Sequence, residues 1–389
     1  MNRALQIGRI LKRIHRAASA VGRPLAFMEV CGTHTMSAFR SGLHSLLPES
    51  VRLVSGPGCP VCVTAQGDID LLLELAALPD ATLCTYGDML RVPGQLGSLE
   101  KARARGADVR VIYSTLEAVE LARRNPERQV ILAAVGFETT APATAAAVLE
   151  ARRQDLRNFS VFASHKRVVP ALTTLLNSGE VKIDGLLCPG HVSAIIGSNA
   201  YRPITEVYRL PCVVAGFEEV HMAAAIATLA EQVRDCRTQL INEYPEAVTP
   251  HGNRAALAIL DEVFEPADVR WRALGWIRQS GLGLRPAYRY FDAARRFALS
   301  APAEREIPGC LCGKVILGAA TPHECRMFGK ACTPVNPIGP CMVSSEGTCQ
   351  AYFKYARVGT VPTTIASRAV NLTEVQEDQE HKEGQPSSA

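Results

Sequence analysis

Nine cysteines of this chain fall into two groups whose spacing suits chemistry at sulfur. Six lie in a 40-residue stretch near the C-terminus: Cys310, Cys312, Cys325, Cys332, Cys341 and Cys349. Three more lie far upstream in glycine-rich segments: Cys31, Cys59 and Cys62. Thiolates bind soft metals and exchange electrons through disulfides. The two groups therefore predict two sulfur sites with different roles, in a protein that handles metal, electrons or both.

The spacing of the C-terminal cysteines does not match the compact metal motifs. Structural zinc sites usually use two close C-x2-4-C pairs, and compact ferredoxin spacing is also absent. An iron–sulfur cluster can take four thiolates from separate loops, and one such set is Cys310, Cys325, Cys332 and Cys349. Cys312 and Cys341 then remain as a pair able to form a disulfide beside the cluster. Spacing alone leaves open which four are ligands, and a set of buried or disulfide-bonded cysteines is the structural alternative.

The upstream cysteines combine a redox motif with a third thiol. Cys59 and Cys62 have C-x-x-C spacing after a predicted strand, at a loop that opens toward a helix. Backbone N–H groups there lower a thiol pKa from about 8.5, which favours a redox dithiol. Cys31 ends another predicted strand, three residues before His34. These thiolates and the imidazole suit a soft iron with open positions, although a histidine bonded to backbone is equally consistent for His34.

Polar residues also follow two other predicted strands. Glu138 and Thr139 offer a carboxylate and a hydroxyl to the same crevice, although a strand-end glutamate is more often a cap or a surface residue. His191 follows Pro189-Gly190 and is equally consistent with a site or a structural role. These residues complete the candidate site because ligands of open parallel sheets bind beyond the carboxyl ends of the strands.

Composition limits the classes of function. With 389 residues, 47% hydrophobic and 21% charged, the chain has an ordinary globular composition and room for two or three domains. The net charge of +4 is small and the basic residues are dispersed, so we expect no nucleic-acid partner. No apolar stretch approaches the roughly 20 residues of a membrane span, so we expect no membrane partner. Thirteen cysteines in so long a chain favour a reducing, cytoplasmic location over a secreted disulfide framework.

Short apolar runs alternate with helical patterns over the first half of the chain, which predicts parallel sheets covered by helices on both faces. The runs are Leu25 to Val30, Val51 to Ser55, Thr82 to Thr85, Val109 to Tyr113, Val130 to Val135, Val161 to Ala163, Gly185 to Leu187 and Cys212 to Ala215. The predicted fold is α/β, with two Rossmann-like parallel-sheet domains and a third, mostly helical or irregular domain that carries the iron–sulfur site.

The predicted boundaries follow from these patterns. Residues 22–126 form one α/β domain with Cys31 and the Cys59/Cys62 motif, and 210–232 is a candidate segment to complete it. Residues 127–209 form the second. Residues 233–360 form the iron–sulfur domain, against which an amphipathic helix at 1–21 is a candidate to pack. The polar segment 361–389 is predicted to be disordered.

Five ordered motifs together resemble the hydrogenase maturation factor HypD family over about residues 22 to 355. They are Cys31-Gly32-Thr33-His34-Thr35, Gly56-Pro57-Gly58-Cys59-Pro60-Val61-Cys62, Gly136-Phe137-Glu138-Thr139-Thr140, Pro189-Gly190-His191-Val192-Ser193 and the C-terminal cysteine cluster. The resemblance implies a scaffold for assembly of the Fe(CN)2CO unit of [NiFe] hydrogenases, with redox activity rather than conventional enzymatic turnover. It also implies a small HypC-like chaperone and a HypE-like cyanide donor as partners.

The resemblance also implies roles for the cysteines. Cys31 and Cys62 would hold the iron, with Cys59 as a redox or auxiliary partner and His34 nearby. The implied ligands of a [4Fe-4S] cluster are Cys310, Cys325, Cys332 and Cys349. Cys312 and Cys341 would form the adjacent dithiol.

Two other functions compete with this interpretation. An iron–sulfur thiol–disulfide oxidoreductase would need the cluster and the Cys59/Cys62 pair, but neither Cys31 nor His34. A nucleotide-binding protein is the weaker alternative, because Gly56-Pro57-Gly58 lacks the third glycine of a dinucleotide fingerprint and the lysine of a P-loop.

Overall fold

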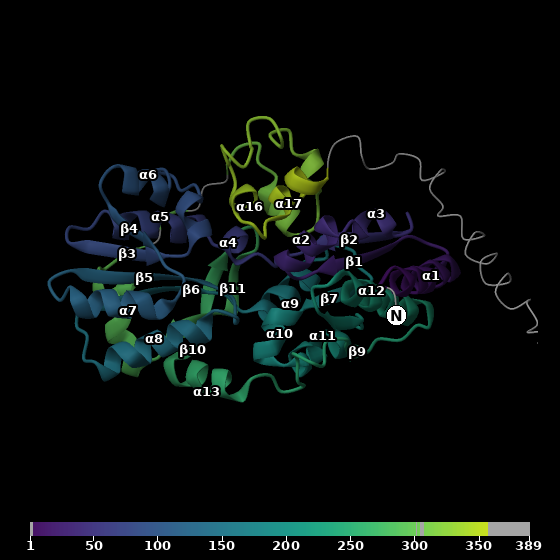
Figure 1. Ribbon diagram of the computed structural model, residues 1–389, viewed down its shortest axis with the longest axis horizontal. Coiled ribbons are helices and arrows are strands. Elements are labelled where there is room, and N and C mark those ends of the chain that lie inside the picture. The colour runs from purple at the N-terminus through teal and green to yellow at the C-terminus, as the bar shows by residue number, and fades with distance from the viewer. Residues whose placement is uncertain (1–2, 301, 304–306, 357–389) are drawn as a thin grey trace, which may run out of the picture. The chain divides into compact units, whose positions relative to one another are not determined.

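The structure of the chain is a computed structural model that describes residues 3–300, 302–303 and 307–356. It confirms the α/β class, with two separate parallel sheets and a cysteine-rich region that is mostly short helices and loops (Figure 1). The segment 361–389, predicted to be disordered, lies outside the described residues.

The larger sheet has five parallel strands in the order β2-β1-β7-β8-β9. Its strands are β1 (Leu25–Glu29), β2 (Val51–Ser55), β7 (Gly185–Pro189), β8 (Cys212–Ala215) and β9 (Leu240–Asn242). The smaller sheet has four parallel strands in the order β4-β3-β5-β6. These are β3 (Ala81–Thr85), β4 (Asp108–Val111), β5 (Gln129–Gly136) and β6 (Phe159–His165). All eight predicted runs are strands, and β9 was not predicted.

Strand pairing does not follow the boundary predicted between residues 126 and 127. β3 and β4 precede that boundary but pair in one sheet with β5 and β6, which follow it. β1 instead pairs with β2 on one side and with β7 on the other, and β8 from the segment 210–232 extends the same sheet. The chain therefore passes from the first sheet to the second after β2 and returns after β6.

Helices cover the sheets and form the two crossings between them. The crossing from β2 to β3 contains α4 (Pro60–Val63) and α5 (Gln66–Ala76), and the return from β6 to β7 is α9 (Val168–Ser178). The other helices up to the fifth strand of the large sheet are α2 (Gly32–Arg40), α3 (Leu43–Leu46), η1 (Gly87–Arg91), α6 (Leu99–Ala104), α7 (Thr115–Arg124), α8 (Ala141–Arg153), α10 (Gly190–Ile196), η2 (Ser198–Tyr201), α11 (Arg202–Val207) and α12 (Glu219–Arg234).

Local sequence explains these elements. After Gln129 every residue of β5 is buried, and such a continuous apolar run is typical of a parallel strand covered on both faces. Helix α7 begins at a capping box in which Ser114 and Glu117 satisfy the first backbone N–H groups. In these segments the secondary structure that the local sequence favours is the one found in the folded chain.

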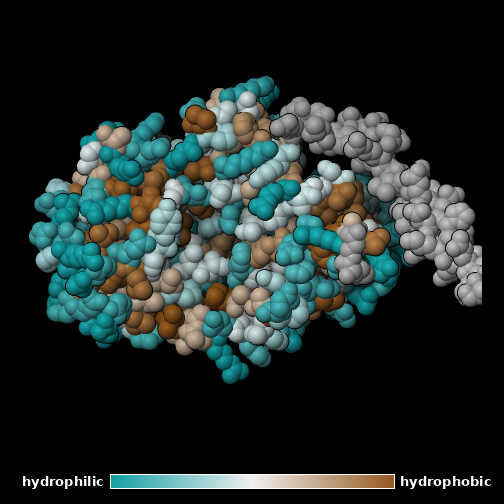
Figure 2. Space-filling view, viewed as in Figure 1, coloured by the Kyte–Doolittle hydropathy of each residue, from teal (hydrophilic) through white to brown (hydrophobic). Residues whose placement is uncertain are grey.

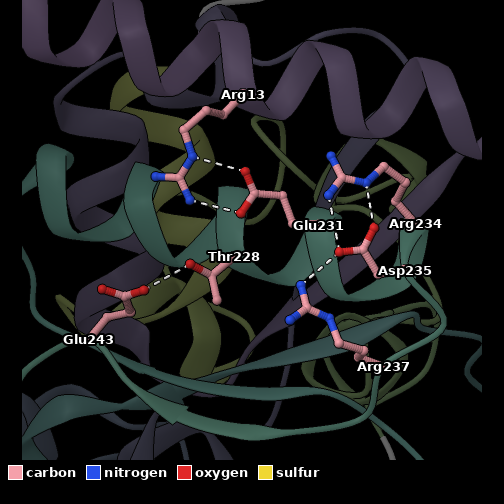
Figure 3. Close-up of polar contacts among 7 residues, drawn as sticks. All are labelled: Arg13, Thr228, Glu231, Arg234, Asp235, Arg237 and Glu243. Atoms are coloured by element: carbon pink, nitrogen blue, oxygen red, sulfur yellow. Dashed lines mark hydrogen bonds and ion pairs between the residues drawn. The ribbon is translucent and has the colours of Figure 1, made fainter.

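The N-terminal helix α1 (Arg3–Val21) is amphipathic as predicted, and it packs on α12. Its buried face contributes Ile14 to a core shared with α12. At the edge of this contact Arg13 donates two hydrogen bonds to Glu231, at 2.9 and 2.8 Å (Figure 3). Burial of the apolar face of α1 is the main stabilisation of its contact with α12, because a half-exposed ion pair such as Arg13–Glu231 contributes only about 0–1 kcal/mol.

The region after β9 is mostly short helices and irregular segments, as predicted, but it also contains a hairpin that was not predicted. It contains α13 (Arg254–Val263) and an antiparallel hairpin of β10 (Phe264–Trp271) and β11 (Gly275–Leu284). Short helices complete it: η3 (Pro286–Phe291), α14 (Ala293–Arg296), α15 (Cys312–Ile316), η4 (Pro322–Glu324), α16 (Pro340–Val343) and α17 (Thr348–Tyr355). Isolated bridges join the hairpin to Thr64 and to Lys166, so the hairpin is tied to the smaller sheet and its crossing segment.

The face seen in Figure 2 carries mainly hydrophilic side chains, with hydrophobic ones scattered among them. Within the described part of the chain, no helix has the length and apolar character needed to cross a membrane.

Candidate metal and thiol site

The strand order of the larger sheet reverses at β1. From β1 the chain adds β2 on one side, whereas β7, β8 and β9 extend the other side. Open parallel sheets bind ligands beyond the carboxyl ends of their strands at such a switch point. Cys31 lies two residues after the last residue of β1, and His191 lies two residues after the last residue of β7. The fold therefore brings two predicted site residues to the place where this architecture holds ligands.

Cys31 is a buried thiol at the first residue before α2. Burial and the nearby carboxyl of Glu346 raise its pKa to about 12, although backbone hydrogen bonds at the helix start oppose the shift. The loop that leads to Cys59 lies directly against it. The backbone N–H of Gly32 donates to the carbonyl of Gly58 at 3.1 Å, and a Cβ on Gly58 would overlap the backbone of Cys31. The glycine is needed for this close approach.

Cys59 and Cys62 are joined by a disulfide, with their Cα atoms 5.2 Å apart. Both are buried, at the start of α4. This is the oxidised form of the dithiol that the C-x-x-C spacing predicts. In this form neither sulfur is a thiolate.

The two histidines contact the same aromatic ring, that of Phe217. His34 is buried, and its Nε2 bonds to the carbonyls of Ala215 and Gly216 at 3.2 and 3.1 Å. Burial lowers its pKa to about 4, so the imidazole is neutral. Phe217 lies 4.8 Å from the His34 ring and stacks on His191 at 3.9 Å. His34 therefore secures the end of β8 through backbone bonds, and Phe217 joins it to His191.

Glu138 is buried at the end of β5 in the smaller sheet, apart from these histidines in the strand order. Its carboxyl accepts a hydrogen bond from the backbone N–H of Val168 at 3.0 Å, at the first residue of α9. Burial raises its pKa to about 7. The neighbouring Thr139 is half-buried. Glu138 thus holds the helix that returns the chain to the larger sheet.

All six C-terminal cysteines line a single small cavity. Phe328, Gly339 and Met342 complete its lining. Side-chain hydrogen bonds link Cys310 to Cys312, Cys312 to Cys341, and Cys341 to Cys349. The predicted dithiol pair, Cys312 and Cys341, is therefore in direct contact.

The cavity has the chemistry that an iron–sulfur cluster requires. It offers convergent sulfurs and apolar walls, and Gly339 leaves room for it: a Cβ there would lie 3.1 Å from the Cys310 sulfur. Among the described residues, no three His, Cys, Asp or Glu side chains are placed to hold a single metal ion. Ligands of a cuboidal cluster surround a larger volume than one ion, so the cysteine-lined cavity fits a cluster better than an isolated ion.

The cysteine-rich region lies directly on the upstream site. Helix α16 contacts α4, and α17 contacts α2, as Figure 1 shows for the yellow-green helices above the blue and purple ones. Cys341 lies on α16 and Cys62 on α4. Phe39 and Tyr352 join α2 to α17 with ring centroids 4.5 Å apart. The two groups of cysteines therefore belong to adjoining helices.

Arg272 connects these two regions and was not identified from the sequence. Its Nε donates to the carbonyl of Thr64 at 3.0 Å and its Nη1 to Gln66 at 3.1 Å, just beyond α4. Its buried Nη2 has no hydrogen-bond partner among the described residues. The hydrogen bond to Cys312, and then burial, raise the pKa of Cys310, and the charge of Arg272 opposes this shift. A single arginine carries no spacing signal, so its role appears only in the folded chain.

The fold and the site define a class: a two-sheet α/β protein in which a cavity lined by cysteines adjoins a buried thiol and a disulfide at a sheet switch point. Comparison with known proteins narrows this class. A family model described as "HypD: Hydrogenase formation hypA family" matches residues 6–356. The chain belongs to the HypD family.

Curated relatives support this membership over nearly their whole length. The chain is 45% identical to "Hydrogenase maturation factor HypD2" of Bradyrhizobium diazoefficiens, over 89% of this chain and 93% of that protein. It is 46% identical to "Hydrogenase maturation factor HypD" of Azotobacter vinelandii, over 88% and 93%. The corresponding protein of Escherichia coli is 42% identical, over 90% and 95%.

Proposed function

We propose that this chain acts in the maturation of [NiFe] hydrogenases, as the scaffold on which the Fe(CN)2CO unit is assembled. One observation carries the proposal: the buried Cys31 at the switch point lies against the loop of Cys59 and Cys62. Membership in a family of hydrogenase maturation factors supplies the biological setting.

Iron is the substrate of this scaffold, and Cys31 and Cys62 are its proposed thiolate ligands. Thiolate donors pair well with ferrous iron that carries cyanide and CO. The disulfide must first accept two electrons and two protons, which breaks the S–S bond and leaves thiols at Cys59 and Cys62. Binding then releases the protons of Cys31 and Cys62, and Cys59 remains as the redox partner.

The cysteine-lined cavity is the proposed source of reducing equivalents. Cys310, Cys325, Cys332 and Cys349 would hold a [4Fe-4S] cluster, which supplies single electrons when bound. Cys312 and Cys341 are the adjacent dithiol, which converts single-electron steps into a two-electron couple. Contact between α16 and α4 supports transfer from this dithiol to the Cys59–Cys62 disulfide.

The proposal requires two partners. A HypC-like chaperone would bring or receive the iron, and a HypE-like protein would donate cyanide. A reducing compartment such as the cytoplasm would keep the remaining cysteines as thiols.

Complementation of a bacterium that lacks its own HypD tests this function. The chain should restore hydrogenase activity, Cys31→Ala should abolish it, and Cys236→Ala should leave it intact because Cys236 is exposed and outside the site. Full activity of Cys31→Ala would overturn the scaffold function.

A thiol–disulfide oxidoreductase carrying an iron–sulfur cluster is the second candidate, favoured by the disulfide lying on the helix that contacts α16. It predicts that Cys62→Ser is inactive whereas Cys31→Ala keeps full activity. The pair of variants therefore separates the two functions.

A further inference from the structure

The cysteine-rich region places a carboxyl group beside Cys31. Glu346 belongs to the segment 344–346 between α16 and α17, the helices of Cys341 and Cys349. The hydroxyl of Thr33 donates to Glu346 Oε1 at 2.8 Å. A Cβ on Gly32 would overlap Glu346, so the residue next to Cys31 must be glycine for this contact. Glu346 thus reaches the upstream site through two neighbours of Cys31.

The same segment is held from the smaller sheet. Asp88, just after β3, accepts hydrogen bonds from the Ser344 hydroxyl and the Ser345 N–H, each at 3.0 Å. The Ser344 hydroxyl also accepts from the backbone N–H of Glu346 at 3.2 Å. The position of Glu346 is therefore set from both sides, by the first turn of α2 and by the end of β3.

Among the described residues, burial, Thr33 and Asp88 are the influences on the charge of Glu346, and none of these is a cation. Burial raises its pKa, the bond from Thr33 opposes the shift, and the carboxylate of Asp88 adds to it. Glu346 lies against Gly32 and its carboxyl accepts a hydrogen bond from Thr33, the two residues that follow Cys31, so its charge disfavours a second negative charge on that sulfur. A cation that binds both groups removes this repulsion, since it is attracted to the carboxylate and the thiolate together.

We propose that Glu346 determines the charge preference of Cys31, so that this thiol reacts poorly with anionic partners and well with cationic ones, metal cations included. The inference rests on the proposed function of Cys31 as an iron-holding thiol. It adds a residue from the cysteine-rich region to that site and assigns it a role in specificity.

Labelling of the metal-free protein with two methanethiosulfonates of opposite charge tests this inference. The Cys31 thiolate attacks the divalent sulfur of the reagent and takes its alkylthio group, forming a mixed disulfide and releasing methanesulfinate. One reagent carries a trimethylammonium group and the other a sulfonate, and mass spectrometry of the Cys31 peptide gives both rates. Glu346→Gln should lower the ratio of cationic to anionic rates by about tenfold, the effect of one pKa unit of interaction. Glu346→Asp, which keeps the charge, should restore most of the ratio.

A matched variant separates charge from structure. Ser344→Ala loosens the same segment without altering charge, so it should change both rates together and leave their ratio as in the wild type. An unchanged ratio in Glu346→Gln, with exposed Cys236 labelled at the wild-type rate, would overturn the proposal. An equal fall of the ratio in Ser344→Ala would do so too. Since no iron is present, either result leaves the scaffold function to its own test.

Discussion

At the scale of single residues, burial and, for Cys310, a hydrogen bond hold the protons of Cys31 and Cys310. Cys31 is buried beside a carboxyl group and keeps its proton at neutral pH, since its pKa is raised to about 12. The pKa of Cys310 is raised as well, by its hydrogen bond to Cys312 and by burial. Thiols of this kind react slowly, because the thiolate is the nucleophile, and a metal that binds them displaces their protons. Cys31 and Cys310 are therefore protonated thiols until a metal, an oxidant or a thiol reagent reacts with them.

Serine substitution in the cysteine-lined cavity distinguishes ligands from the adjacent dithiol. Anaerobically purified protein should contain about four irons per chain, the content of one [4Fe-4S] cluster. Serine should remove most of this iron at each of four positions: Cys310, Cys325, Cys332 and Cys349. Serine at Cys312 or Cys341 should leave iron content and the visible spectrum unchanged. Loss of the cluster in those two variants would show that the assignment of ligands is wrong.

Glu138 should make stability depend on pH. Burial raises its pKa from 4.5 to about 7, so the folded chain keeps a proton that the unfolded chain loses above about pH 4.5. Its stabilising contribution is therefore complete below that pH and is lost as pH rises through about 7. Glu138→Gln still accepts the bond from Val168 and lacks this titration. Relative to the variant, the wild type should lose about 2–3 kcal/mol between about pH 4.5 and 8 in urea unfolding.

A matched substitution supports the interpretation of that experiment. Glu180→Gln changes an exposed glutamate and should follow the wild type at every pH. If the difference between Glu138→Gln and the wild type is the same at all pH values, burial of this carboxyl does not control its proton.

The candidate site residues that the sequence identified all belong to a motif. The cysteines and His34 were recognised by their spacing and by their place after strands. Glu346 and Arg272 were missed, because a single charged residue shows no spacing and acts only through tertiary contacts. The hydrogen bond of Glu138 could not be predicted from sequence either, because its partner Val168 lies thirty residues later in the chain.

At the scale of elements, periodicity predicted the strands well and the hairpin poorly. The buried parallel strands are continuous apolar runs, which is the pattern that sequence shows most clearly. β10 has Pro266 and several charged residues, and its burial alternates irregularly. A half-exposed hairpin of this composition resembles a loop in sequence, which is why the region was predicted to be helical or irregular.

Arg272 should stabilise the contact between this hairpin and the segment after α4. Arg272→Met removes hydrogen bonds to Thr64 and Gln66, and bonds of charged groups contribute about 1.5–3 kcal/mol each. We expect the free energy of unfolding to fall by about 3–6 kcal/mol, measured by urea denaturation. Arg278→Met changes an exposed arginine of the same hairpin and should stay within about 0.5 kcal/mol of the wild type. Equal effects of the two variants would contradict this role.

At the scale of the whole molecule, the two crossings between the sheets bring the site together. The first crossing contains α4 with the Cys59–Cys62 disulfide, and the second begins at α9, which Glu138 holds. The cysteine-rich region then packs on α2 and α4. Chain order alone does not encode which parallel strands pair, so the sequence predicted the strands but not that β3 and β4 share a sheet with β5 and β6, across the predicted boundary at 126 and 127. The contact between the two groups of cysteines likewise arises from tertiary packing, and the spacing of the cysteines in the sequence does not show it.

Infrared spectroscopy tests the scaffold function most directly. The chain should be purified anaerobically with its HypC-like partner and examined in the region of cyanide and carbonyl stretching vibrations. We predict bands of iron-bound cyanide and CO that disappear in Cys31→Ala and in Cys62→Ala but persist in Cys236→Ala. Absence of these bands from active, partner-bound protein, or their persistence without Cys31, would contradict the assignment of Cys31 and Cys62 as the thiolates that hold the iron.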